Sequence, residues 1–141
     1  MEYRRFDNTI FARLDPGEDV AEQIRAIALA EDIRLASVNG VGATDLFSVG
    51  VFGDTLDTHH SVTYDTGHEI VSLCGSITTF HGEYYAHFHI AAADKEGVVH
   101  GGHMIQCRVF ATCELTITIS QGHVDRFHDK EATGLNLLSF D

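Results

Sequence analysis

Basic residues are scarce in this sequence: 9 Lys and Arg stand against 21 Asp and Glu, a formal net charge of −12 with histidine neutral. Arg4 and Arg5 form the only basic pair, and there is no longer Lys/Arg cluster. Duplex nucleic acid and membrane surfaces are themselves polyanionic and repel such a chain. Nucleic-acid binding by this chain alone is therefore disfavoured, unless a metal or a local patch reverses the field.

Long apolar runs and a cysteine framework are also lacking. No apolar stretch approaches the ~20 residues that a membrane-spanning helix needs, and residues 1–7 contain no apolar segment of the signal-peptide type. The three cysteines, Cys74, Cys107 and Cys113, are odd in number and follow no disulfide spacing. We therefore expect reduced thiols, a cytoplasmic location and no membrane partner. Cys107 and Cys113 lie in strand-like runs and are expected to be small core residues.

The remaining composition is ordinary for a globular protein, with 44% hydrophobic and 21% charged residues over a length of 141. That length is sufficient for one buried core. No internal repeat, low-complexity segment or linker divides the chain. We expect a single domain spanning residues 1–141.

Hydrophobic periodicity predicts one helix among many strands. Apolar residues such as Val20, Ile24 and Ile27 recur at helical steps within residues 18–32, and Asp15 is expected to cap this helix. Strands are predicted over residues 3–14, 33–38, 46–52, 69–80, 84–93, 98–110 and 112–120, with connections at 39–43 and 53–61 and a tail from residue 122. Short connections favour antiparallel neighbours. The sequence predicts an α+β fold, a mainly antiparallel β-sheet of about seven strands with one main α-helix packed on it.

Three histidines in two neighbouring segments carry the clearest chemical signal. His87 and His89 form a His-x-His pair in a predicted strand, where alternate side chains project from the same face. His103 follows a glycine pair in the next predicted strand. Three neutral imidazoles on one face would be the ligand set of a catalytic-type zinc site with an open fourth position.

The register of the hairpin between residues 93 and 99 determines whether His103 lies on the same face as His87 and His89. A three-residue loop closed by Gly97 in the left-handed conformation is a favoured hairpin form. It pairs Asp94 with Val98 and, by counting back, His89 with His103. A two-residue loop, or a bulge at the preceding glycine pair, would re-aim the last histidine. In that case the histidines are separate surface or core residues.

Several strings of this chain recur together in one known family. The strand Gly-His-Glu-Ile-Val-Ser-Leu-Cys-Gly-Ser-Ile stands at residues 67–77. Further matching segments follow in the same order at residues 13–19, 38–43, 87–89, 101–103, 113–117 and 133–135. In this combination the chain resembles the plant and prokaryote conserved (PPC) domain, also called DUF296, in its standalone prokaryotic form. The resemblance spans almost the whole chain.

This resemblance implies an α+β domain that assembles as a homotrimer and binds a divalent metal, expected to be zinc, at the His-x-His and Gly-Gly-His positions. Carried over, the metal ligands are His87, His89 and His103. In plant relatives an AT-hook, an Arg-Gly-Arg-Pro-type arm, precedes the domain and binds the minor groove. This chain carries no such arm, and it has His68 where the plant strand has Arg. The family's DNA-binding label therefore does not transfer by default.

Other ionisable side chains each allow two interpretations. Glu69 begins a predicted strand and is the candidate catalytic residue, as a general base, a fourth ligand or an acceptor for an imidazole N–H. The alternative for Glu69 is a structural partner for Arg108 or a backbone amide. His100 is expected on the surface, although a loop could bring it toward the metal site. Glu114 is expected to face outward or a subunit partner. Arg126 is a candidate for holding an anion or an intersubunit carboxylate.

Three functional hypotheses follow. The first is a trimeric metal-binding module with a regulatory or ligand-binding role and a small-molecule or protein partner. The second is a metal-dependent enzyme, a hydrolase or lyase that uses a metal-bound water with Glu69 as its base. The third is a DNA-associated protein, which the family label suggests and the net charge of −12 opposes.

Overall fold

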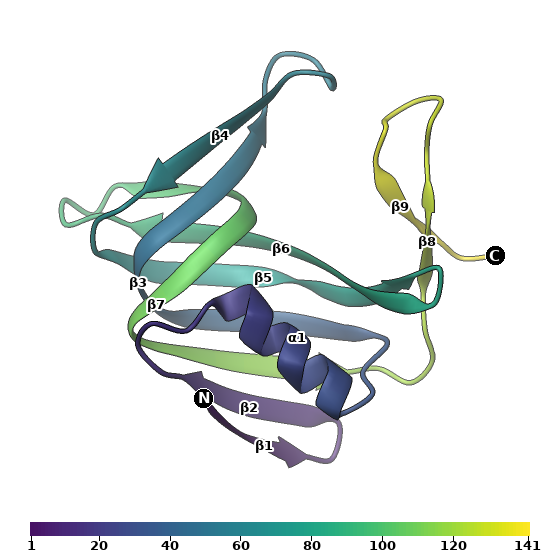
Figure 1. Ribbon diagram of the computed structural model, residues 1–141, viewed down its shortest axis with the longest axis horizontal. Helices are drawn as coiled ribbons and strands as arrows, with labels where there is room; N and C mark the ends of the chain where they lie inside the picture. The colour runs from purple at the N-terminus through teal and green to yellow at the C-terminus, as the bar shows by residue number, and fades with distance from the viewer.

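Nine strands and one helix make up the structure, a computed structural model that describes residues 1–141 (Figure 1). The elements are β1 (Glu2–Phe6), β2 (Thr9–Leu14), α1 (Val20–Ala30), β3 (Ala36–Phe52), β4 (His59–Tyr64), β5 (His68–Phe80), β6 (Glu83–Ala93), β7 (Val99–Ile119), β8 (Asp125–His128) and β9 (Asn136–Ser139). No helix is both long and apolar enough to cross a membrane.

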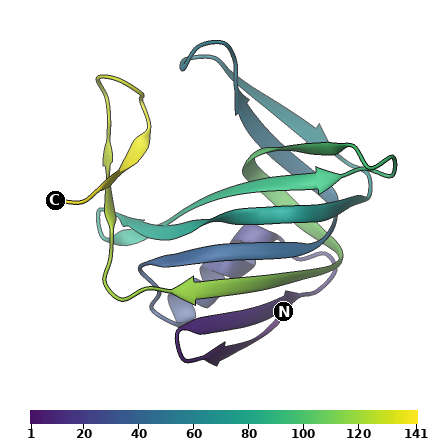
Figure 2. The ribbon, with the colours of Figure 1, turned by 180° about the vertical axis from the view of Figure 1, so that it is seen from behind.

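Seven strands form one antiparallel sheet in the order β1-β2-β7-β6-β5-β3-β4, with an additional pairing of β3 to β7. The long strands β3 and β7 each bend and pair on different neighbours along their length, which curls the sheet (Figures 1 and 2). The expected seven-stranded antiparallel sheet with one packed helix is confirmed, although the helix comprises only 11 residues.

The helix covers one face of the sheet and begins later than predicted. Its apolar stripe of Val20, Ile24 and Ile27 is fully buried and joins a 24-residue core. The predicted cap, Asp15, is wrong: the N-cap is Asp19, whose carboxylate accepts a hydrogen bond from the backbone N–H of Glu22 at 3.0 Å. Asp19 fits the role because its extended backbone aims the carboxylate at the free amides of the first turn.

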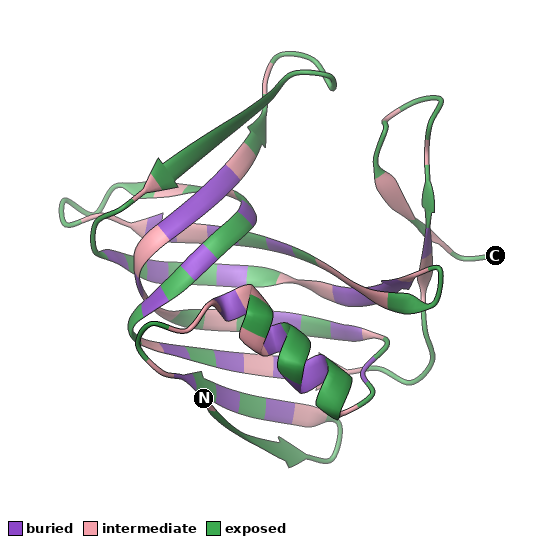
Figure 3. Ribbon diagram, in the orientation of Figure 1, coloured by how far each residue is buried: buried purple, intermediate pink, exposed green.

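Buried and exposed residues alternate along the strands (Figure 3). We call the side opposite the helix the outer face; it is the side seen in Figure 2. Paired residues on neighbouring strands share a face. One row of partners therefore crosses the outer face, from His103 on β7 through His89, Cys74, Asn39, Thr116 and Phe11 to Arg4 on β1.

Several predicted boundaries are wrong because pairing partners override local signals. Residues 3–14 form a hairpin rather than one strand, turning at Asp7 with a left-handed φ of 56°. The glycine-rich residues 39–43 lie inside β3 and not in a connection, with a bulge between Gly40 and Gly42. The two strands predicted over residues 98–110 and 112–120 form the single strand β7 (Val99–Ile119). Part of the predicted loop 53–61 belongs to β4, which pairs with β3.

The tail forms a separate two-stranded sheet, β8 and β9, which we call the C-terminal hairpin (residues 125–139). It projects from the end of the main sheet near the β5–β6 turn (Figures 1 and 2). Apolar side chains remain uncovered on and beside it: Phe127 and Leu138 are exposed, and Phe140 is 82% exposed.

Candidate metal centre

The β6–β7 turn adopts the three-residue loop predicted from sequence. The backbone N–H of Asp94 donates to the carbonyl of Val98 at 2.9 Å, and Gly97 has a left-handed φ of 80°. The Asp94 carboxylate also accepts hydrogen bonds from the backbone N–H groups of Glu96 and Val98, at 3.0 and 2.9 Å. These bonds tighten the turn and set the register of the strands that follow.

This register places His89 directly opposite His103. His87 lies two residues before His89 on β6 and shares its face. The three imidazoles form a cluster whose potential ligand atoms all lie within 4.8 Å of one another. All three residues are exposed at the surface of the sheet. The predicted convergence of the three side chains is therefore confirmed.

One edge of this cluster matches the ligand spacing of a tetrahedral metal. Nε2 of His87 lies 3.3 Å from Nε2 of His89. Two nitrogens bound to zinc at about 2.0–2.1 Å with tetrahedral angles are separated by about 3.3–3.4 Å. In the metal-free protein the same contact is an N–H···N hydrogen bond in which one ring donates. The residues present therefore fit a divalent metal with nitrogen ligands.

The protonation state of the cluster also favours metal binding. Burial, followed by the neighbouring imidazoles of His103 and His89 and the charge of Arg126, lowers the pKa of His87. Burial and then His89 lower the pKa of His103. Both rings are therefore neutral near pH 7, the form in which imidazole ligates a metal.

Close backbone packing holds β6 in place beneath the cluster. A Cβ on Gly75 of β5 would collide with the carbonyl oxygen of His87 and would lie 2.8 Å from the Cα of Phe88. Similarly, a Cβ on Gly101 would collide with the carbonyl oxygen of Ile90. On the other side of β6, the Phe88 and Ile90 side chains are buried in the core. Glycines and core residues together position the histidine backbone.

Glu69 lies apart from the three histidines. It pairs with Ala93 and is exposed. Ala93 is four residues from His89 along β6, which corresponds to about 13 Å at the ~3.3 Å rise of a strand. The alternative partner suggested for Glu69, Arg108, instead donates from Nε to Asp45 at 2.8 Å. The catalytic role of Glu69 stays a prediction.

His100 is not the free surface residue expected. Its Nε2 lies 3.0 Å from the Asp94 carboxylate, and its ring lies 4.8 Å from that of Tyr64. His68 is buried nearby, with Nδ1 at 2.7 Å from the carbonyl oxygen of Thr66. The contact between Tyr64 and His100 could not be predicted from the sequence, because the two residues meet only through the pairing of distant strands. Neither histidine belongs to the metal cluster.

Arg126 is the residue whose placement sequence reasoning left most open. Arg126 belongs to the tail of the chain, yet its side chain is buried against β5 and β6. Its guanidinium carbon lies 4.7 Å from the ring centroid of Tyr85, two residues before His87. The sequence carried no signal for this contact, because it arises from the packing of the C-terminal hairpin against the end of β5 and β6.

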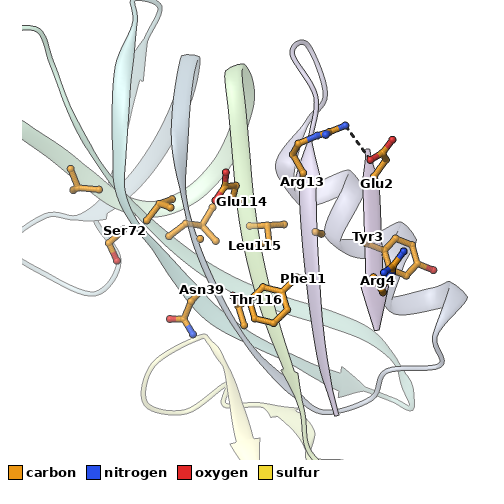
Figure 4. A pocket seen from close by; sticks show the side chains of 15 residues that line it. Glu2, Tyr3, Arg4, Phe11, Arg13, Asn39, Ser72, Glu114, Leu115 and Thr116 are labelled. Carbon is orange, nitrogen blue, oxygen red and sulfur yellow. Dashed lines mark ion pairs between the residues drawn. The ribbon is translucent and has the colours of Figure 1, made fainter. Parts of the chain in front are cut away.

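Two hollows in the structure differ in how they lie relative to the three histidines. A groove of ≈ 710 Å³ on the outer face is lined by Phe11, Asn39, Glu114 and the Arg13–Glu2 ion pair, among others (Figure 4). None of the three histidines lines this groove. A smaller cavity of ≈ 250 Å³ between α1 and β6 includes His103 in its wall.

Comparison with known proteins identifies a family. The Plants and Prokaryotes Conserved (PCC) domain, the same family as PPC, matches the chain over residues 1–121. No functionally curated protein matches.

Among solved structures, the chain is similar to a candidate DNA-binding protein from Bacteroides thetaiotaomicron, with 20% identity, TM-score 0.94, and 99% of this chain and 96% of that chain covered. A candidate DNA-binding protein from Ralstonia eutropha is 26% identical, with TM-score 0.88 and coverage of 99% and 96%. A protein from Archaeoglobus fulgidus described as metal-containing is 26% identical, with TM-score 0.84 and coverage of 98% and 96%.

Proposed function

The chain belongs to the Plants and Prokaryotes Conserved domain family, and we propose that it is a metal-binding member with His87, His89 and His103 as the ligands. The observation that carries this proposal is the 3.3 Å separation of Nε2 of His87 and Nε2 of His89, which matches a tetrahedral ligand edge. The similar protein from Archaeoglobus fulgidus is described as metal-containing, which supports the same conclusion. Zinc is the proposed ion, since imidazole nitrogen in tetrahedral geometry suits it.

We propose further that the protein is a homotrimer with a regulatory or ligand-binding role. Exposed apolar side chains support assembly: Phe127 and Leu138 on the C-terminal hairpin, Phe140 beside it, and Phe11 and Val41 on the outer face. Where exposed apolar side chains gather into a patch, they mark interaction sites. Three protein ligands leave one metal position open, and a small molecule or a partner side chain can take it. The three free cysteines support the proposed cytoplasmic location.

Native mass spectrometry of untagged protein tests the metal and the trimer in one experiment. We expect an assembly of three chains that carries three zinc ions, one for each three-histidine cluster. Treatment with a chelator should remove the zinc mass. A monomeric mass would refute the trimer, and a zinc-free assembly from zinc-supplemented medium would refute the metal site.

A metal-dependent enzyme is the second candidate. Three histidines with an open position are the ligand set of many catalytic zinc sites, and a metal there would supply Lewis-acid chemistry when bound. Within one chain the cluster contains only imidazoles, and Glu69 lies about 13 Å away by strand rise. We therefore place the binding role first and keep Glu69 as the proposed base of the enzyme hypothesis.

DNA association is the third candidate, because two similar structures are described as candidate DNA-binding proteins. The net charge of −12 opposes it. We expect no binding of a mixed-sequence duplex in a fluorescence anisotropy titration at low salt, where phosphate contacts are strongest. Saturable binding that weakens as salt is added would overturn this expectation.

A further inference from the structure

Arg126 is a buried cation without an anionic partner. The residue is only 8% exposed, and no Asp or Glu oxygen lies within 4.0 Å of its guanidinium. Arginine is rarely buried to this extent unless it is paired, because removing its charge from water is costly. The structure therefore contains a nearly buried positive charge that no carboxylate of this chain neutralises.

Neutral contacts hold the guanidinium in a defined place. Its Nε donates to Oγ1 of Thr78 at 2.8 Å, and Nη1 donates to the carbonyl oxygen of Asn136 at 2.7 Å. The guanidinium also lies against the face of Tyr85. These contacts use two of the five N–H donors of arginine, which leaves three available for an acceptor.

The register connects this position to the three histidines. Thr78 pairs with Tyr85, and the next pair on the same face is Ser76 with His87. Two residues of strand separate Tyr85 from His87, a distance of about 7 Å.

We propose that Arg126 and the three-histidine metal site together bind a small dicarboxylate. One carboxylate would pair with the free donors of Arg126, a fork that matches carboxylate geometry. The other would face the metal. The inference rests on the proposed metal-binding function, and it assigns that site a ligand class: short organic dianions. Arg126 is the specificity residue and His87 marks the boundary between the two halves of the site.

Isothermal titration of succinate into zinc-loaded wild-type protein tests this inference, with acetate as the monoanion for comparison. We expect succinate to bind more tightly than acetate.

Arg126→Gln should weaken succinate binding about 10- to 100-fold, the range for losing a charge-assisted hydrogen-bonding partner. Arg126→Lys, which keeps the charge and loses the fork, should give an intermediate loss and guards against a folding defect. Arg108→Gln removes an arginine that already pairs with Asp45, and should leave succinate affinity unchanged.

The zinc content of each titrated sample is measured as well. It distinguishes failure of the dicarboxylate inference from failure of the proposed metal-binding function. Zinc-loaded wild type that does not bind succinate, or Arg126→Gln that binds it as wild type does, overturns this inference and leaves the metal site intact. Wild type that never retains zinc overturns the proposed function and this inference with it. A change of assembly mass in Arg126→Gln, with no succinate binding by wild type, would show that a carboxylate of another copy neutralises Arg126 and would also overturn the proposal.

Discussion

His89→Ala is expected to abolish stoichiometric zinc binding while leaving the fold intact. His89 is central to the cluster: it faces His103 across the β6–β7 ladder, and its Nε2 lies 3.3 Å from that of His87. Its removal leaves two imidazoles and two open positions. Even loss of an outer hydrogen-bonding partner costs a metal site about 10- to 100-fold in affinity, so loss of a direct ligand should exceed that range. Zinc per chain after dialysis, measured by elemental mass spectrometry, is the readout.

The fold should tolerate this substitution because the His89 side chain is exposed and contributes nothing to the core. Without metal, the free energy of unfolding should change by no more than about 0.5 kcal/mol, as at other surface sites. With zinc present, wild type should gain thermal stability that the variant does not, since metal binds the native state. His123→Ala, at an exposed histidine outside the cluster, is the matched control and should keep one zinc per chain. Full zinc retention by His89→Ala would contradict the ligand assignment.

The metal centre could be predicted from sequence because its geometry is local. His87 and His89 share a face by strand periodicity alone. His103 joins them through a turn of a few residues, whose form is favoured by Gly97 in the left-handed region and by Asp94 as a side-chain acceptor. Both determinants lie between the histidines in the chain. No contact from a distant segment is needed to establish which residues face one another.

Features that depend on distant pairing could not be predicted in the same way. The glycine-rich segment at 39–43 looks like a connection, yet β5 and β7 pair with it on both sides and extend it into β3. A β-bulge between Gly40 and Gly42 accommodates the irregular backbone of this segment within the β3–β5 pairing. Arg126 reaches Tyr85 from 41 positions further along the chain only because the C-terminal hairpin packs against the end of β5 and β6. Such contacts depend on topology, and periodicity contains no information about them.

Gly75→Ala is expected to be the most damaging single-methyl change next to the site. Gly75 pairs with Phe88, and a Cβ there would meet the carbonyl oxygen of His87 and lie 2.8 Å from Cα of Phe88. Backbone atoms cannot rotate away, so β5 and β6 must separate. Overpacking of this kind costs about 1–3 kcal/mol or more in free energy of unfolding. Because the displaced atoms belong to His87 and its neighbour, zinc affinity should fall as well.

Gly67→Ala is the matched control, since a Cβ at that glycine would have no heavy atom within 4 Å and its φ lies outside the left-handed region. Replacing a glycine there restricts the unfolded chain, and a neutral effect or a gain of about 0.4–1 kcal/mol is expected. Urea unfolding of both variants in chelator isolates the packing cost, and zinc titration of the folded proteins then measures the effect on the ligands. Equal stability of the two variants would show that β5 and β6 are not locked together at His87. Lowered stability with unchanged zinc affinity would show that the histidines are positioned by the β6–β7 turn alone, without support from β5.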